Sequence, residues 1–359
     1  MRMLVLFLIC LVATPAFAGN TKGKKLIEYG WDCPNTEYVR KNIAEMEKVP
    51  FDGVVIQVMS GTGHPAASPS LGWQVFTKEK INPEDCAQAI ADLKATKFKK
   101  LTDNFIQVIS MPGDIDWFDP GWDSVAHNTA MLARVAKQGG CKGIMFDPEE
   151  YGQYPIWSYH RMTAEMKVKH TYEEYAAKVR DRGREFIRAI NKEFPDITIL
   201  ALFGPSLTYL GQLKNPVSEV NCSLLAAFYD GVCEAATSKT ILVDGYEMSY
   251  GFRTEYKFAE GRQFMLDSYK MFTNKEAFKK HVRVGFGVWA DRNSLELGWH
   301  PDDFSKNYFT PAALRESLNY ALGQSDGYVW VYSERFSWWG GTAPKEFVEA
   351  LRLCKTGSK

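Results

Sequence analysis

Eight short runs of β-type residues alternate with longer stretches of helical periodicity, and this alternation limits the possible folds more than any other feature. The runs begin at Lys25, Gly53, Asn104, Lys142, Ile197, Thr240, Val282 and Gly327. Between them lie helix start and stop signals, among them Asn82-Pro83, a capping box at Thr171, Thr310-Pro311 and the pair Gly139-Gly140. Strands that alternate with helices in this way form parallel sheets.

A closed barrel explains eight such units better than an open sheet does. The turn after the first run, GWDCPN, is not the glycine-rich phosphate loop of doubly wound sheets. The segment LLAAFYDGVCEAA from Leu224 reads as a helix by length and alanine content, although as a strand it would make a ninth. We therefore expect an α/β fold, a single-domain (β/α)8 TIM barrel with long βα loops, over residues 19–359.

The first 18 residues have the features of a cleavable export signal: Arg2, a short apolar core, and Ala16-Phe17-Ala18 as a small-x-small end. We expect a secreted or periplasmic protein with no membrane span, because no later run reaches the ~20 apolar residues that a span needs. Nucleic acid is not an expected partner, since basic and acidic residues balance at 43 each and no basic run occurs.

Polar and aromatic residues finish the β-type runs, where the active sites of such barrels lie. Five carboxylates are candidate catalytic groups: Asp147 and Glu149 after the fourth run, Asp244 and Glu247 after the sixth, and Glu334 after the eighth. Candidate substrate-binding residues are Trp31, Asp32, Glu150, Tyr151, Tyr246, Trp289, Trp330 and Tyr332.

Strand parity separates these candidates, because alternate side chains of a barrel strand point inward. Asp147 and Glu149 share an inward parity, whereas Glu150 is out of phase. Tyr332 and Glu334 are also predicted to point inward.

In the sixth run, we place Asp244 and Tyr246 inward, in phase with Leu242. Glu247 reaches the site only if Gly245 breaks the strand.

Paired carboxylates suit glycoside hydrolysis, in which one carboxylic acid protonates the departing oxygen and a second carboxylate is the nucleophile or the base. With Asp-x-Glu at the end of its fourth strand, the chain resembles the glycoside hydrolase barrels, including the chitinase-like group. This resemblance implies that Glu149 is the general acid/base and Asp147 its supporting carboxylate. Lys142 and Met145 stand where the chitinase-like enzymes have two further aspartates.

Other sugar-cleaving barrels have an Asp nucleophile on the fourth strand and an Asp acid on the sixth, and resemblance to them implies Asp147 and Asp244. Either way, the chain is predicted to be a secreted glycosidase that cleaves a poly- or oligosaccharide. The alternatives are a non-catalytic glycan-binding barrel and, less favoured, a metal-dependent barrel hydrolase. The six histidines form no HxH pair, so we expect neither a metal nor another cofactor.

Aromatic residues make up 14% of the chain and support a sugar ligand, because ring faces pack on pyranose faces. About half of seven loop aromatics are expected to bind sugar: Trp117, Trp122, Tyr154, Trp157, Trp299, Trp338 and Trp339. The expected ligand is a neutral or acidic glycan, bound without metal. The competing interpretation of the carboxylates is a structural network tied to Arg283 or Arg292.

Overall fold

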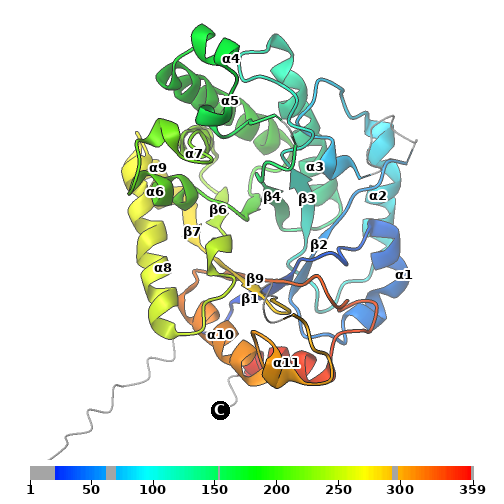
Figure 1. Ribbon diagram of the computed structural model, residues 1–359. Helices are drawn as coiled ribbons and strands as arrows, with labels where there is room; N and C mark the ends of the chain where they lie inside the picture. Colours follow the sequence, from blue (N-terminus) through cyan, green and yellow to red (C-terminus); the bar gives the residue numbers. More distant parts are fainter. Residues whose placement is uncertain (1–20, 62–69, 153, 293–297, 357–359) are drawn as a thin grey trace, which may run out of the picture.

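The strands of the computed structural model run in the order of the predicted β-type runs (Figure 1). The structure describes residues 21–61, 70–152, 154–292 and 298–356, so the predicted export segment lies outside the described residues. The strands are β1 (Lys25–Glu28), β2 (Gly53–Ile56), β3 (Phe105–Ile109), β4 (Gly143–Asp147), β5 (Thr198–Ala201), β6 (Ile241–Asp244), β7 (Val282–Val284), β8 (Phe286–Trp289) and β9 (Tyr328–Tyr332).

All strand pairs are parallel, in the order β7-β6-β5-β4-β3-β2-β1-β9-β8. β7 and β8 are two halves of the predicted seventh strand, interrupted only by Gly285. β7 pairs with β6 and β8 pairs with β9, so this strand joins both ends of the sheet. At the junction, Gly285 N donates to Asp244 O (2.8 Å) and Asp326 N donates to Val284 O (2.8 Å). The predicted eight-stranded barrel is confirmed as a nearly closed one.

The helices surround the strands (Figure 1). They are α1 (Thr36–Met46), α2 (Pro83–Ala95), α3 (Asp123–Gln138), α4 (Ala164–Lys169), α5 (Tyr172–Glu193), α6 (Ser206–Gln212), α7 (Leu225–Ala235), α8 (Glu255–Asp267), α9 (Lys275–His281), α10 (Pro311–Gln324) and α11 (Lys345–Thr356). Short 3₁₀ helices are η1 (Leu71–Trp73), η2 (Pro120–Trp122), η3 (Tyr159–Arg161), η4 (Val217–Glu219), η5 (Glu247–Ser249), η6 (Ser268–Met271) and η7 (Phe304–Lys306).

The local signals in the sequence set these helix ends correctly. Capping boxes start α2 at Asn82 and α5 at Thr171, and Gly139 caps the C-terminal end of α3. The ambiguous segment from Leu224 forms α7 and is therefore a helix, as predicted. Among the described residues, no helix is long and apolar enough to cross a bilayer.

Two apolar cores hold the barrel. The larger one lies between strands and helices, and the smaller one fills the bore with side chains such as Ile27, Phe105, Met145 and Trp330. Gly287 makes room for Trp330, because a Cβ at this glycine would lie 2.7 Å from the indole ring. The bore is thus a packed core, as in other barrels of this type, which leaves room for a ligand only above it.

Candidate active site

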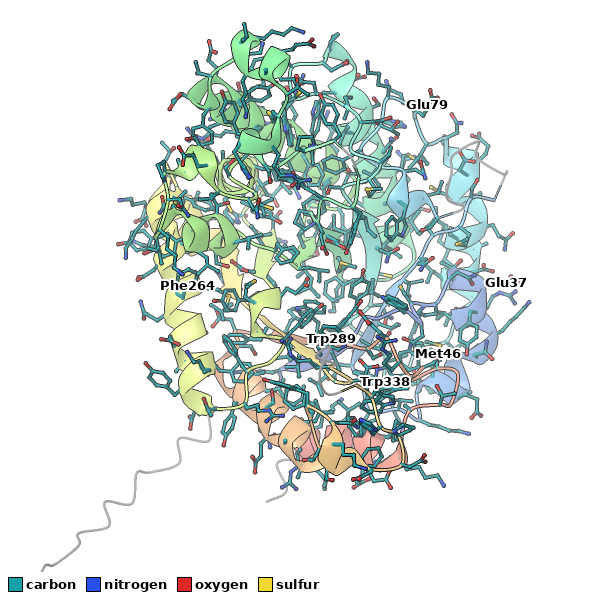
Figure 2. The ribbon with its side chains drawn as sticks, viewed as in Figure 1. Glu37, Met46, Glu79, Phe264, Trp289 and Trp338 are labelled. Atoms are coloured by element: carbon teal, nitrogen blue, oxygen red, sulfur yellow. The ribbon has the colours of Figure 1, made fainter. Side chains whose placement is uncertain are left out.

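A cavity of about 590 Å³ lies at the C-terminal ends of the strands, within the usual size range of small-molecule sites. It is lined by Tyr29, Gly30, Trp31, Gln57, Trp73, Gln107, Glu149, Tyr151, Leu202, Glu247, Tyr250, Trp289, Tyr332 and Glu334. Figure 2 shows one of them, Trp289, near the centre of the ring of strands, whereas Phe264 lies out on α8. A larger groove of about 760 Å³ follows α10 and α11 but has no aromatic side chain among its described lining residues.

Glu149 enters the cavity beside a buried aspartate. Asp147 ends β4 and is completely buried; its Oδ1 accepts a hydrogen bond from Glu149 N (2.9 Å) and its Oδ2 accepts one from Tyr151 Oη (3.0 Å). Burial, with a smaller contribution from the Glu149 charge, raises the pKa of Asp147 to about 7. Asp147 therefore sets the positions of Glu149 and Tyr151 from beneath and does not itself line the cavity.

Glu247 reaches the cavity because β6 breaks, the condition that the sequence analysis required. β6 ends at Asp244, Gly245 O accepts a hydrogen bond from Trp330 Nε1 (2.8 Å), and Tyr246 is left-handed with φ 42°. Burial first, and then the charges of Asp147 and Glu149, raise the pKa of Glu247 to about 9. Glu247 thus holds its proton at neutral pH.

Glu334 lies on the rim after β9 and is held by two contacts. Its Oε1 accepts a hydrogen bond from Tyr332 Oη (3.0 Å), and its backbone N donates to the buried carboxylate of Asp291 (2.9 Å). Asp291 also accepts from Trp289 Nε1 (2.7 Å). One buried carboxylate therefore joins Trp289, at the end of β8, to the loop after β9 that carries Glu334.

Asp244 does not line the cavity, and its predicted inward parity is wrong. The bore contains Val243, while Leu242 packs in the outer core, so the strand is in the opposite phase. The Asp244 carboxylate accepts hydrogen bonds from Ser206 N (3.1 Å) and Tyr246 N (3.3 Å). Both faces of this strand are apolar, so hydrophobicity alone cannot indicate which face is inward.

Glu150 also points away from the cavity. Its carboxylate accepts hydrogen bonds from Trp157 N (2.6 Å) and Ser158 N (3.0 Å) and pairs with Arg161 (2.8 Å). A structural network thus exists, but it involves Glu150 and Arg161 instead of Arg283 or Arg292, and Glu150 does not line the cavity as a substrate-binding residue would.

Three further candidates lie outside the cavity. Asp32 Oδ2 accepts from Ser337 Oγ (2.8 Å) and Trp338 N (2.8 Å), which ties down the loop after β9. Tyr246 packs in the outer core, and Trp330 is completely buried in the bore. The remaining substrate-binding candidates, Trp31, Tyr151, Trp289 and Tyr332, do line the cavity.

The seven loop aromatics expected to divide between binding and packing do not line the cavity. Trp117, Trp122 and Trp157 are buried, and Trp117 contacts both others, at centroid distances of 5.0 Å to Trp122 and 5.1 Å to Trp157. The aromatic wall consists instead of Trp31, which is 72% exposed, the pair Trp73 and Tyr151 (5.6 Å between centroids), and Tyr250, Trp289 and Tyr332.

Several cavity residues were not predicted from the sequence. Tyr29 and Gln57 directly follow β1 and β2, and Gln107 lies within β3, all on the inward face. Inward parity applied to these runs would have identified them, because a glutamine inside an apolar run is itself a signal. Trp73 ends the short 3₁₀ helix η1 and Tyr250 directly follows η5, and both lie between strand and helix, where strand periodicity indicates no direction.

The cavity carries an excess of acidic groups. Three glutamates line it, and none of its described lining residues is Lys, Arg or His. Within the described part of the chain, no group of three or more His, Cys, Asp or Glu side chains is arranged to hold a metal ion.

The buried carboxyls should make the protein less stable at alkaline pH. The folded-state pKa values of Asp147 (about 7) and Glu247 (about 9) lie above the ordinary values of 3.8 and 4.5. Their contribution to stability is complete at low pH and is lost as pH rises through the folded pKa. We expect the melting temperature to fall by roughly 5 °C between about pH 6.5 and pH 9 in a calorimetric scan. The melting temperature of the Glu247→Gln variant should fall less over the same pH range. An equal fall in the variant would show that Glu247 is not the cause.

Comparisons with known proteins find only distant structural similarities. No protein-family model and no curated sequence matches the chain. A glycoside hydrolase family 5 enzyme from Prevotella bryantii is 9% identical, with a TM-score of 0.49 over 90% of this chain and 88% of its own. A broad-specificity endoglucanase from Ruminococcus champanellensis is 11% identical (TM-score 0.49; 87% and 85%), and an E. coli 3-keto-D-glucoside 4-epimerase is 12% identical (TM-score 0.45; 93% and 99%).

The similar solved structures thus include glycoside hydrolases and an epimerase. Similarity this distant carries no information on activity, which has to come from the cavity itself. The chain is a single-domain (β/α)8 barrel whose candidate site is the carboxylate-lined cavity at the C-terminal ends of its strands.

Proposed function

We propose that the protein is a glycoside hydrolase in which Glu247 donates a proton and Glu149 is the partner carboxylate. The observation that carries this proposal is the presence of both glutamates in one aromatic-lined cavity, with the pKa of Glu247 raised to about 9. Glycoside hydrolysis needs such a pair, one carboxyl protonated and the other ionised.

The proposed reaction starts with the glycosidic oxygen beside Glu247. Glu247 gives its proton to this oxygen as the bond to the anomeric carbon breaks, so that the leaving group departs as an alcohol. Glu149 either attacks the anomeric carbon or removes a proton from the attacking water. The environment of Glu247 favours the protonated form before substrate arrives, because burial and two neighbouring carboxyls oppose its ionisation.

These roles differ from the ones that the chitinase-like resemblance implied, in which Glu149 is the acid. They follow the other arrangement, with a carboxylate after the fourth strand and an acid after the sixth, but use Glu149 and Glu247 in place of Asp147 and Asp244. Both aspartates are buried below the rim and hydrogen-bonded to backbone N–H groups. Asp147 then acts on the reaction through Glu149 and Tyr151, as a positioning residue.

Hydrolysis of a glycan panel after chelation tests the proposal. The full chain is treated with EDTA and incubated with neutral, amine-bearing and acidic oligosaccharides, and new reducing ends are measured. We expect cleavage of at least one member at a rate that EDTA does not change, because no step requires a metal. Activity lost with EDTA would favour the metal-dependent hydrolase, and binding without cleavage would favour the glycan-binding barrel.

Export remains part of the proposal, since polysaccharides are met outside the cell. The protein should be recovered from the medium or periplasm with an amino terminus directly after Ala18; recovery only inside the cell with Met1 intact would contradict export.

A further inference from the structure

Glu334 is not needed for the proposed reaction, which uses only Glu149 and Glu247. It nevertheless lines the same cavity, and Tyr332 and Asp291 hold it there. Its Oε1 accepts a hydrogen bond from Tyr332, while no described residue donates a hydrogen bond to its Oε2. A positioned carboxylate with a free oxygen suggests a role in recognising the ligand.

We infer that the cavity selects its glycan by charge: it binds sugar units that are neutral or carry an amine, rejects units that carry a carboxylate or sulfate, and uses Glu334 as a specificity-determining residue. This inference rests on the proposed function and narrows the neutral or acidic ligand expected from the sequence to exclude acidic glycans.

The charges around the cavity support the rejection of anions. No described lining residue is basic. Arg161 pairs with Glu150 (2.8 Å), and Arg292 lies over the rings of Tyr308 (5.1 Å) and Trp289 (5.8 Å). Arg335, the exposed residue after Glu334, is not a lining residue either. An anionic sugar would therefore meet Glu149 and Glu334 with no basic side chain among the described lining residues, which costs binding energy in a partly desolvated site.

Neutral and amine-bearing sugars meet no such penalty. Hydroxyl and ammonium groups are donors, and the glutamates are acceptors that need donors when a ligand displaces water. Aromatic faces add to this preference, because Trp289 and Tyr332 lie 5.5 Å apart on the same wall and can face either a pyranose ring or an ammonium group.

Titration calorimetry with matched sugars tests the inference. Glu247→Gln keeps the charge of a protonated Glu247 and slows cleavage of these oligosaccharides, so it serves as the binding protein. The ligands are gluco-, galacto- and manno-oligosaccharides, each with its uronate and its 2-amino counterpart. We expect the uronate of the best-bound series to bind at least ~10-fold more weakly than the neutral sugar, and the amine at least equally well.

Two further results separate charge from shape. The gap between uronate and neutral sugar should narrow as salt rises from about 0.05 to 0.5 M, because screening weakens repulsion but not a steric clash. Adding Glu334→Gln to the Glu247→Gln protein should reduce the ratio of uronate to neutral-sugar dissociation constants at least ~3-fold. Equal binding of uronate and neutral sugar, or a gap unchanged by both salt and Glu334→Gln, would overturn the inference.

Tryptophan quenching tests the inference without any sugar. Trp31 lines the cavity and is 72% exposed, so the fluorescence lost in Trp31→Phe reports on the cavity mouth. Caesium should quench this fraction at least ~3-fold more strongly than iodide after correction for free tryptophan, because a negative site concentrates cations. Trp299→Phe is the control, since Trp299 packs against Phe336 (5.4 Å) away from the cavity.

The two kinds of experiment fail in different ways. Caesium preference without cleavage of any glycan would leave the charge selectivity standing and remove the hydrolase proposal. Equal or stronger quenching of Trp31 by iodide would overturn the selectivity even if glycans are cleaved.

Discussion

Glu247→Gln is expected to lower kcat for glycosides with poor leaving groups by ~10²- to 10⁴-fold, because the variant keeps the shape of the acid but has no proton to give. Glycosides with good leaving groups, such as dinitrophenolate, need little protonation and should lose much less. Initial rates on the two substrate classes measure the difference. Glu346→Gln, an exposed glutamate on α11, is the matched control and should leave both rates unchanged.

The pH profile gives this prediction a second readout. In the wild type, activity should fall as pH rises through about 9, where Glu247 loses its proton. The variant should lack this alkaline limb. If Glu149→Gln instead loses activity only on substrates with poor leaving groups, Glu149 is the acid, as the chitinase-like resemblance implied.

Glu149→Ala is expected to lower kcat by at least ~10³-fold for both substrate classes, since a nucleophile or base is needed whatever the leaving group. The variant also lacks the carboxylate that helps to keep Glu247 protonated, so we expect the alkaline limb of the residual activity to move to lower pH. Residual rates and pH profiles on an activated substrate measure both effects.

Azide rescue then separates the two possible roles of Glu149. If Glu149 is a nucleophile, azide should restore turnover of the activated substrate and yield a glycosyl azide of inverted configuration, identified by NMR. If it is a base, the wild type should release the inverted sugar directly. Full activity of Glu149→Ala would remove the hydrolase proposal.

Much of the fold could be predicted because its signals are local. Each β-type run became a strand, or in the seventh case two strands around Gly285, and the capping residues at Asn82 and Thr171 marked helix starts. The C-terminal ends of parallel strands must meet on one rim, so the position of Glu149 in the cavity also followed.

The orientation of individual side chains was less predictable. Buried parallel strands are apolar on both faces, so hydrophobicity could not show which face of β6 points into the bore. Asp244 was therefore predicted on the inward face, whereas it lies on the outward one. The loops posed a different difficulty, because a tryptophan such as Trp157 is equally suited to a core and to a sugar site. Tertiary packing decided in favour of the core.

The sequence by itself determined the barrel, the rim on which its carboxylates gather and the presence of Glu149 in the cavity, since these depend on periodicity and chain order. Only the tertiary structure decided which carboxyl keeps its proton. The pKa of Glu247 depends on burial and on Asp147 and Glu149, which lie about a hundred positions earlier in the chain. No local sequence pattern predicts that Glu247 lies near Asp147 and Glu149, because these residues come together only when β4 and β6 join the same barrel.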